Sequence, residues 1–222
     1  RPDVLVLDTD SRFDDARTAY NKVYRAARKL QSLGASRFYS KTCSVFRGNI
    51  GAQFDAMLDA LGEEFAVIVL GFPKNGRTTK DGIHYVHGVA LEHSEFRRDP
   101  MHPMTQSNLA DILQAQTTRR VSSISHKRVQ QGPSALRQEL DELRGVYSYV
   151  IIDVTEQADL ETIAQSVSDR SLWCGSSGLA EELAKRHKAE FTSGTVADAD
   201  LVLPACSPGQ GIFIAAGSLM PQ

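Results

Sequence analysis

Short apolar runs alternate along the chain with segments of helical periodicity. Most of these runs are continuously apolar and partly β-branched, as expected for parallel strands that are buried on both faces of a sheet. Each run then breaks into a polar or glycine-rich loop. We predict such strands at residues 4–7, 37–41, 65–71, 121–125, 149–153 and 172–175.

Between the predicted strands, apolar residues recur at spacings of three and four, which predicts amphipathic helices. The first helix covers residues 16–34, with Asp14 or Asp15 as its N-cap and Gly34 as its C-cap. Alternating strands and helices indicate an α/β fold, with a mostly parallel sheet covered by helices on both faces. Further helices are predicted at residues 50–61, 107–115, 133–143, 160–167 and 179–187.

Residues 72–106 interrupt this alternation, because a loop from a strand to a helix usually has only about 2 to 6 residues. Within them, the apolar stretches 83–86 and 89–91 flank His87 and Gly88, which predicts a small β-hairpin. Long ordered loops often carry function, so we interpret this segment as a lid or an interface.

The predicted α/β domain covers residues 1–188. The chain begins without Met on an apolar run, and residues 215–222 resemble a strand that enters another element, so we interpret the sequence as a fragment. Residues 189–222 are assigned to a linker and the first strand of a further domain.

Composition places the chain among globular proteins, with 41% hydrophobic and 23% charged residues. The formal net charge of −2 lacks the basic excess of a nucleic-acid-binding protein. No apolar run approaches the ~18 residues of a membrane span, and the first residues do not resemble a signal peptide. The three cysteines never form a C-x-x-C pair, so we expect reduced thiols and a cytoplasmic protein without a nucleic-acid or membrane partner.

Candidate chemistry lies at the carboxyl ends of the predicted strands, where α/β sheets bind their ligands. Basic side chains there could pair with an anionic group, and hydroxyl, amide and carboxylate groups could bind hydroxyls, so a small polyhydroxylated acid fits. Alternatively, these residues only cap and bridge loops. The candidates are Asp8, Asp10, Ser11, Arg12, Lys41, Ser44, Arg47, Gly48, Asn49, Arg77 and Thr78, with Asp153 and the turn 175–178 at later strand ends.

Other motifs give weaker signals. The turn 175–178, Gly-Ser-Ser-Gly, could cradle an anion at a helix N-terminus or simply allow close packing. The sequence lacks a dinucleotide-binding fingerprint, a Walker motif and a nucleophile elbow. The histidines at 84, 87, 93 and 102 do not have the spacing of a metal site, so we expect no metal ligands among them. Cys43 could be a reactive thiol or a small core filler.

Several motifs, in order along the chain, resemble the four-carbon acid sugar kinase family, which phosphorylates threonate, erythronate and 3-oxo-tetronate. The resemblance covers about residues 4–217. Its motifs are residues 8–12 (DTDSR), 41–51 (KTCSVFRGNIG), 76–79 (GRTT), 88–91 (GVAL) leading to Phe96 and Asp99-Pro100, and 175–180 (GSSGLA).

The resemblance implies the sugar-acid-binding N-terminal domain of an ATP-dependent kinase, with Mg²⁺ neutralising phosphate charge and a homodimer as one assembly. It implies that ATP is held mainly by a C-terminal domain. Ser218 would lie at the start of that domain and contact ATP. It also implies a strand and an acidic loop before Arg1, so the domain would be incomplete. Asp10 is the best remaining candidate for the catalytic base, and the other strand-end residues would bind substrate.

Two positions depart from the family pattern. Cys43 stands where an Asp is expected and Val45 where a Thr is expected. The loss of a carboxylate motivates a rival hypothesis, a sugar-acid-binding or regulatory paralogue without catalysis. A third hypothesis is an α/β enzyme of another reaction type.

Overall fold

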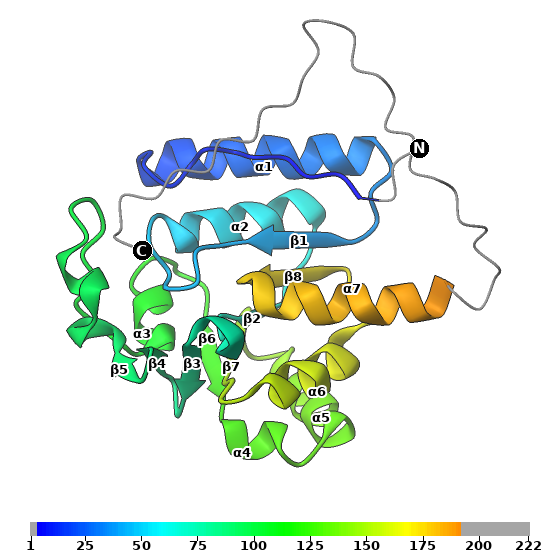
Figure 1. Ribbon diagram of the computed structural model, residues 1–222. Helices are drawn as coiled ribbons and strands as arrows, with labels where there is room; N and C mark the ends of the chain where they lie inside the picture. Colours follow the sequence, from blue (N-terminus) through cyan, green and yellow to red (C-terminus); the bar gives the residue numbers. More distant parts are fainter. Residues whose placement is uncertain (1–3, 192–222) are drawn as a thin grey trace, which may run out of the picture.

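A computed structural model describes residues 4–191 of the chain, apart from the side chains of residues 188–191 (Figure 1). Five parallel strands form one sheet in the order β1-β8-β2-β7-β6. This order places β8, β2 and β7 inside the sheet, and every residue of these three strands is buried. The strands are β1 (Phe38–Lys41), β2 (Ala66–Val69), β6 (Val121–Ile124), β7 (Tyr149–Ile152) and β8 (Leu172–Gly175).

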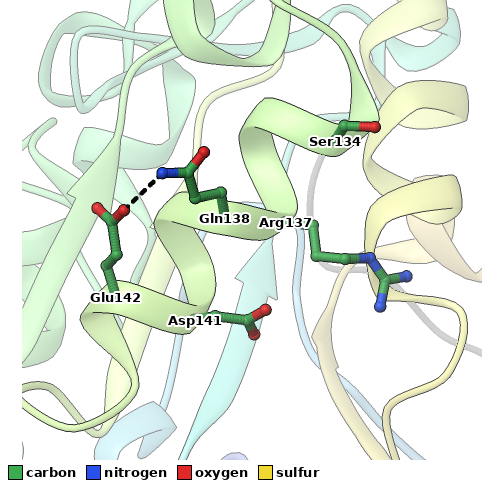
Figure 2. Close-up of a pocket in the computed structure, with 5 residues that line it drawn as sticks. All are labelled: Ser134, Arg137, Gln138, Asp141 and Glu142. Carbon is green, nitrogen blue, oxygen red and sulfur yellow. Dashed lines mark hydrogen bonds between the residues drawn. The ribbon is translucent and has the colours of Figure 1, made fainter.

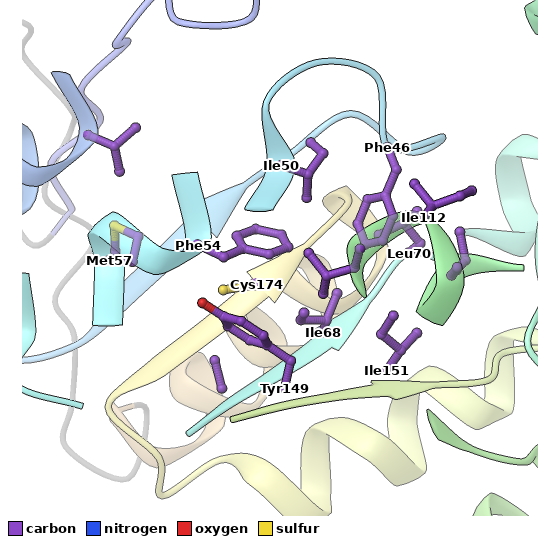
Figure 3. Packing of buried hydrophobic residues seen from close by; sticks show 14 of the residues in the cluster. Phe46, Ile50, Phe54, Met57, Ile68, Leu70, Ile112, Tyr149, Ile151 and Cys174 are labelled. Atoms are coloured by element: carbon purple, nitrogen blue, oxygen red, sulfur yellow. The ribbon is translucent and has the colours of Figure 1, made fainter. Parts of the chain in front are cut away.

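One face of the sheet is covered by α2 (Ile50–Leu61) and α3 (Leu109–Gln114), and α1 (Ala16–Ser32) packs outside α2. Figure 3 shows this core, in which the ring of Phe54 from α2 lies 6.1 Å from the ring of Tyr149 on β7. The hydroxyl of Tyr149 reaches the edge of this layer and donates to Asp55. This layer confirms the predicted helices at 16–34, 50–61 and 107–115.

The other face is covered by α4 (His126–Val129), α5 (Pro133–Leu143), α6 (Gln157–Val167) and α7 (Ser177–Phe191). Neighbouring residues of a strand alternate between the two cores, because side chains of a strand point to opposite faces. Ile68 belongs to the first core, whereas Val67 and Val69 belong to the second. The fold is therefore the predicted α/β fold with helices on both faces.

The long segment after β2 contains a second, antiparallel sheet of β3 (Arg77–Lys80), β4 (Ile83–Val86) and β5 (Val89–Ala90). The predicted hairpin is confirmed as β4 and β5, and β3 extends it. A bridge joins β3 to the chain just after β7, because Thr79 N donates to Val154 O at 2.6 Å and Val154 N donates to Thr79 O at 3.0 Å. Three short 3₁₀ helices complete the segment: η1 (Pro73–Asn75), η2 (Leu91–His93) and η3 (Glu95–Arg98).

The predicted strand at residues 4–7 is wrong for this structure. Val4 and Val6 are 76% and 92% exposed, and the segment has no regular secondary structure. The run is apolar enough for a buried strand, but no described strand pairs with it, so its backbone makes no sheet hydrogen bonds there. The chain becomes regular at Asp15, which caps α1 by accepting from Thr18 N at 3.0 Å.

Among residues 4–191, no helix is long and apolar enough to cross a membrane. The domain boundary near residue 188, the linker and strand predicted for 189–222, and Ser218 lie at or beyond the edge of the described residues, so they stay predictions.

Candidate functional site

Four basic residues that were predicted as ligands gather where β1 ends and β3 begins. We call Arg12, Lys41, Arg47 and Arg77 the strand-end cations. Cys43 is the residue that connects them, because its thiol accepts a hydrogen bond from Arg47 and its charge acts on both Lys41 and Arg77.

Arg47 is held by three contacts. It donates to Asp99 Oδ2 at 2.6 Å and to Cys43 Sγ at 3.4 Å, and its guanidinium lies 5.1 Å from the centre of the Phe96 ring. Burial opposes the charge of Arg47, yet the hydrogen bonds with Cys43 and Asp99 raise its pKa. Burial also opposes the thiolate of Cys43, and the hydrogen bond and charge of Arg47 outweigh it, so the pKa of Cys43 is lowered. This pair favours a charged thiolate beside a fixed guanidinium.

Arg77 shares the Phe96 ring with Arg47, at 5.5 Å from the ring centre. It donates to the carbonyl of Asn75 and contacts His87 Nε2, both at 3.0 Å. Its Nε is buried without a partner, and no carboxylate of the described residues lies within ion-pairing distance. Partial burial lowers the pKa of Arg77. Arg77 is therefore an anchored guanidinium with unused hydrogen-bonding capacity.

Lys41 and Arg12 complete the group. Lys41 donates to the carbonyl of Thr42 at 3.0 Å. Desolvation and the positive charge of Arg12 lower the pKa of Lys41, against the opposing charge of Cys43. The side chain of Arg12 lies against Gly48, where an added Cβ would meet its Cγ at 2.9 Å. Within residues 4–191, neither cation forms an ion pair with a carboxylate.

The arrangement suits a small anion. Of the four strand-end cations, only Arg47 is neutralised by a carboxylate, and positive charges gathered at a sheet edge favour an anionic ligand. Guanidinium groups recognise carboxylate and phosphate through paired N–H donors, so either group would match Arg77.

The remaining predicted residues divide into two sets. Asn49 donates to the carbonyl of Asp14 at 2.6 Å, and Ser11 is buried and accepts from Gln53 at 3.1 Å, so both fix the loops that carry the cations. Asp8 and Asp10 are exposed, and Asp8 accepts only from the amide of Asp10. The structure does not bring Asp10 into contact with the strand-end cations.

Ser44 and Thr78 are the last two predicted ligands, and each is a chain neighbour of this group, in the loop after β1 and in β3. Both are partly buried, and Thr78 pairs with Tyr85 in the small sheet. No described side-chain hydrogen bond joins either residue to the strand-end cations.

Three residues of the long segment belong to the site although they were not predicted as ligands. Asp99 accepts from Arg47 and from the amides of Met101 and His102, and these bonds lower its pKa although burial acts to raise it. His102 contacts the carbonyl of Arg12 at 3.1 Å, and its ring stacks on Phe13. Phe96 supports both arginines. The signal for Phe96 and Asp99 was their place in the motif that leads to Phe96 and Asp99-Pro100, whereas His102 lies outside that motif.

The turn after β8 packs closely rather than opening into a cradle. The carbonyl of Gly175 accepts from Thr42 N at 2.8 Å, and an added Cβ at Gly175 would meet Val69 O at 2.0 Å. Gly175 has φ +147°, which favours glycine. The turn therefore locks the ends of β1, β2 and β8 together, which agrees with the packing alternative.

A shallow hollow on α5 is a poorer candidate site. Figure 2 shows its lining residues on one exposed helix, with Gln138 bonded to Glu142. Its one cation, Arg137, pairs with Asp169 at 2.6 Å, so its charge is neutralised. The hollow lies away from the strand ends, on the opposite layer from α2.

The chain matches known proteins over most of its length. The family model described as "Sugar-binding N-terminal domain" matches residues 1–183. A 3-oxo-tetronate kinase of Brucella melitensis is 36% identical over 188 residues, which make up 82% of this chain and 43% of that protein. A D-erythronate kinase of Heliobacterium modesticaldum is 38% identical over 166 residues, 74% of this chain and 38% of the relative. The chain thus spans about half or less of the length of these curated relatives.

Solved structures show the same fold. A Haemophilus influenzae protein of the DUF1537 family matches with a TM-score of 0.78 and 34% identity, over 81% of this chain and 45% of that one. A DUF1537 domain of unknown function from Bordetella bronchiseptica matches with a TM-score of 0.69 and 26% identity, over 83% and 45% of the two chains. That structure is described as a domain-swapped dimer with bound citrate.

Proposed function

Because this chain belongs to the family of sugar-binding N-terminal domains, we propose that it is the sugar-acid-binding part of an ATP-dependent kinase that phosphorylates a hydroxyl of a four-carbon sugar acid. The observation that carries the proposal is the group of strand-end cations, three of which lack a carboxylate partner among the described residues. The relatives are named as kinases of 3-oxo-tetronate and D-erythronate, and both substrates are four-carbon sugar acids that carry a carboxylate.

In this proposal the chain's own residues bind and orient the acid. Arg77 and Lys41 pair with the carboxylate, and Arg47 is held ready by Asp99 and Phe96. Phosphoryl transfer depends mainly on positioning and on stabilising charge, so such a rigid cationic site is the contribution that this domain can make. Asp10 remains the proposed base, although its exposed position requires a movement of residues 8–12 toward the substrate.

The described residues around the strand-end cations do not fit Mg²⁺-ATP. Mg²⁺ favours carboxylate oxygens, but Asp99 is committed to Arg47 and two amides, and Asp8 and Asp10 stand apart. We therefore assign ATP and Mg²⁺ to other parts of the intact protein, including Ser218 as the proposed ATP contact.

The test is ADP release by the intact gene product with Mg²⁺-ATP and a panel of erythronate, both threonates and 3-oxo-tetronate. We expect turnover with one acid. Arg77→Gln should raise KM for that acid about tenfold to a hundredfold, since a lost charged hydrogen bond costs about 1.5–3 kcal/mol. Arg137→Gln, on the far layer, is the matched control and should leave KM unchanged. Equal KM values for both variants would contradict the placement of the acid at Arg77.

A second candidate is a sugar-acid-binding paralogue without catalysis. It is favoured by the separation of Asp10 from the cations and by Cys43 in place of the family's Asp. Binding of the acids without turnover by the intact protein would support it. A large gain of turnover in Cys43→Asp would then indicate a kinase that has lost its activity.

We also propose that the protein is cytoplasmic, which agrees with the free thiols of Cys43 and Cys174. The proposal also includes a homodimer, supported by the dimer described for the Bordetella bronchiseptica domain.

A further inference from the structure

A second cluster of ligand-type side chains lies away from the strand-end cations, beside the turn between β3 and β4. Asp81 comes from that turn, His126 begins α4 after β6, and Asp153 follows β7. One ligand atom from each residue lies within 4.8 Å of the other two. Three segments that are distant in sequence therefore bring one imidazole and two carboxylates together.

Asp153 organises the cluster. Its carboxylate is fully buried and accepts from the amides of Asp81 at 2.6 Å, Gly82 at 3.1 Å and His126 at 3.2 Å. It thus fixes the backbone of both other residues. A carboxylate has about four acceptor positions, so three amides leave one position for a further partner.

His126 provides the observation that points to a ligand. Its side chain is only 13% exposed, and its buried Nδ1 has no hydrogen-bond partner. The nearest acidic atom is Asp81 Oδ1 at 3.8 Å, which is too long for a hydrogen bond. Buried polar atoms are normally satisfied, so an unpartnered imidazole nitrogen that faces a carboxylate requires an explanation.

We propose that Asp81, His126 and Asp153 bind a divalent transition-metal ion, with Zn²⁺ as the best match. Zinc bonds to imidazole nitrogen and carboxylate oxygen are about 2.0–2.2 Å long, so one ion can contact both atoms of a pair 3.8 Å apart. The imidazole disfavours Mg²⁺ and Ca²⁺, which take oxygen ligands. Asp81 is 63% exposed, which leaves the site open to solvent for a water as fourth ligand.

The ion would fasten the β3–β4 turn to the ends of β6 and β7. This role is independent of the proposed kinase activity, because the strand-end cations lie at the opposite end of β3. We therefore predict that metal binding stabilises the protein and that each chain binds one ion at this cluster.

The experiment uses the intact protein, freed of affinity tags and stripped with a chelator. Zn²⁺, Mn²⁺ and Mg²⁺ are titrated separately by calorimetry, and Tm is measured with and without each ion. We expect Zn²⁺ to bind and raise Tm, and His126→Gln and Asp81→Asn each to weaken that binding at least about tenfold, as the loss of a ligand should. Asn tolerates the left-handed backbone of Asp81, whose φ is +52°, so this variant keeps the turn.

The matched control is His93→Gln, because His93 Nε2 lies 3.6 Å from Glu92 Oε1 in an exposed pair with a similar separation. This variant should bind Zn²⁺ like the unmodified protein. The proposal is overturned if Zn²⁺ does not bind, if binding is unchanged in both His126→Gln and Asp81→Asn, or if Cys43→Ser or His93→Gln abolishes it instead.

Discussion

At the scale of single residues, the contact between Cys43 and Arg47 defines the chemistry of the site. The hydrogen bond and charge of Arg47 lower the pKa of the Cys43 thiol, whereas complete burial raises that of Cys174. Cys43 is partly accessible and Cys174 is not. The two thiols should therefore differ strongly in reactivity.

We expect iodoacetamide to alkylate Cys43 and spare Cys174 in the native protein at pH 7. The pH at half-maximal rate should lie below the ordinary thiol value, because the thiolate persists to lower pH. Arg47→Gln should shift this midpoint upward. The measurement is mass spectrometry of labelled peptides in a Cys206→Ser background. A midpoint that Arg47→Gln leaves unchanged would show that the guanidinium does not stabilise the thiolate.

His84 gives a pH dependence of stability. It is fully buried, and burial lowers its pKa to about 4. In the unfolded chain a histidine titrates near ~6.5, so the unfolded state binds the proton first as the pH falls. His84 therefore does not reduce the free energy of unfolding above about pH 6.5, and it reduces that free energy progressively as the pH falls toward 4.

Between pH 7 and pH 4 this linkage should cost the folded protein about 3 kcal/mol. The Gln side chain of His84→Gln can still contact Thr79 but does not titrate. Between pH 7 and pH 4 the free energy of unfolding of this variant should therefore fall by about 3 kcal/mol less than that of the unmodified protein. Urea unfolding at several pH values measures both proteins. Parallel pH profiles would mean that His84 is not protonated on unfolding.

Sequence reasoning predicted the strand-end cations because each lies near the end or start of a predicted strand, although the run before Arg12 forms no strand in the structure. It did not identify Asp99 as the partner of Arg47, since the two residues lie 52 positions apart and only the folded chain joins them. The cluster of Asp81, His126 and Asp153 was missed for the same reason. No spacing rule connects three separate loops.

At the scale of elements, the contact between α2 and the end of α3 depends on Gly51. An added Cβ at this position would lie 2.3 Å from the carbonyl oxygen of Gln116. The amide of Gly51 donates a hydrogen bond to the side-chain oxygen of Gln116 at 3.1 Å, which holds the loop after α3 against α2. Glycine is needed here because it lets α2 approach the loop after α3 closely, and not because the backbone adopts a special turn.

Gly51→Ala should destabilise the protein by about 1–3 kcal/mol, as overpacking does. Helix propensity alone predicts the opposite sign, since Ala exceeds Gly by about 1 kcal/mol in a helix interior. Gly145→Ala, where an added Cβ meets nothing within 4 Å, is the control and should be nearly neutral. Chemical denaturation compares the two, and a stabilised Gly51→Ala would refute the close approach.

Most elements were predictable because their periodicity was strong. The errors have separate causes. The apolar run 4–7 lacks a described neighbour to pair with. β3 was hidden because Arg77–Lys80 is polar, and its pairing with β4 depends on the backbone. The helix α4 is a single short turn with little periodicity of its own.

At the scale of the whole molecule, the two cores share one sheet. Phe54 belongs to the core under α2, and Leu136 belongs to the core under α5. Since each strand contributes to both cores, the two layers should unfold together rather than in sequence.

Phe54→Ala and Leu136→Ala should each cost about 2–5 kcal/mol, as large-to-small core changes do. Both should shift one and the same transition. Trp173, the single tryptophan, lies in the second core and reports on it by fluorescence, while circular dichroism reports on both layers. If Phe54→Ala moved the circular dichroism transition but left the Trp173 transition in place, the two cores would be independent.

The bridge between Thr79 and Val154 also has a consequence for the order of folding. Its two residues are far apart in the sequence, so closing that loop is entropically unfavourable until other contacts have shortened it. The small sheet can form its own hairpin locally, but its bridge to Val154 needs the end of β7 in place. We therefore expect β3, with Arg77 at its start, to dock late in folding, so that the anion site is completed only when the parallel sheet is in place.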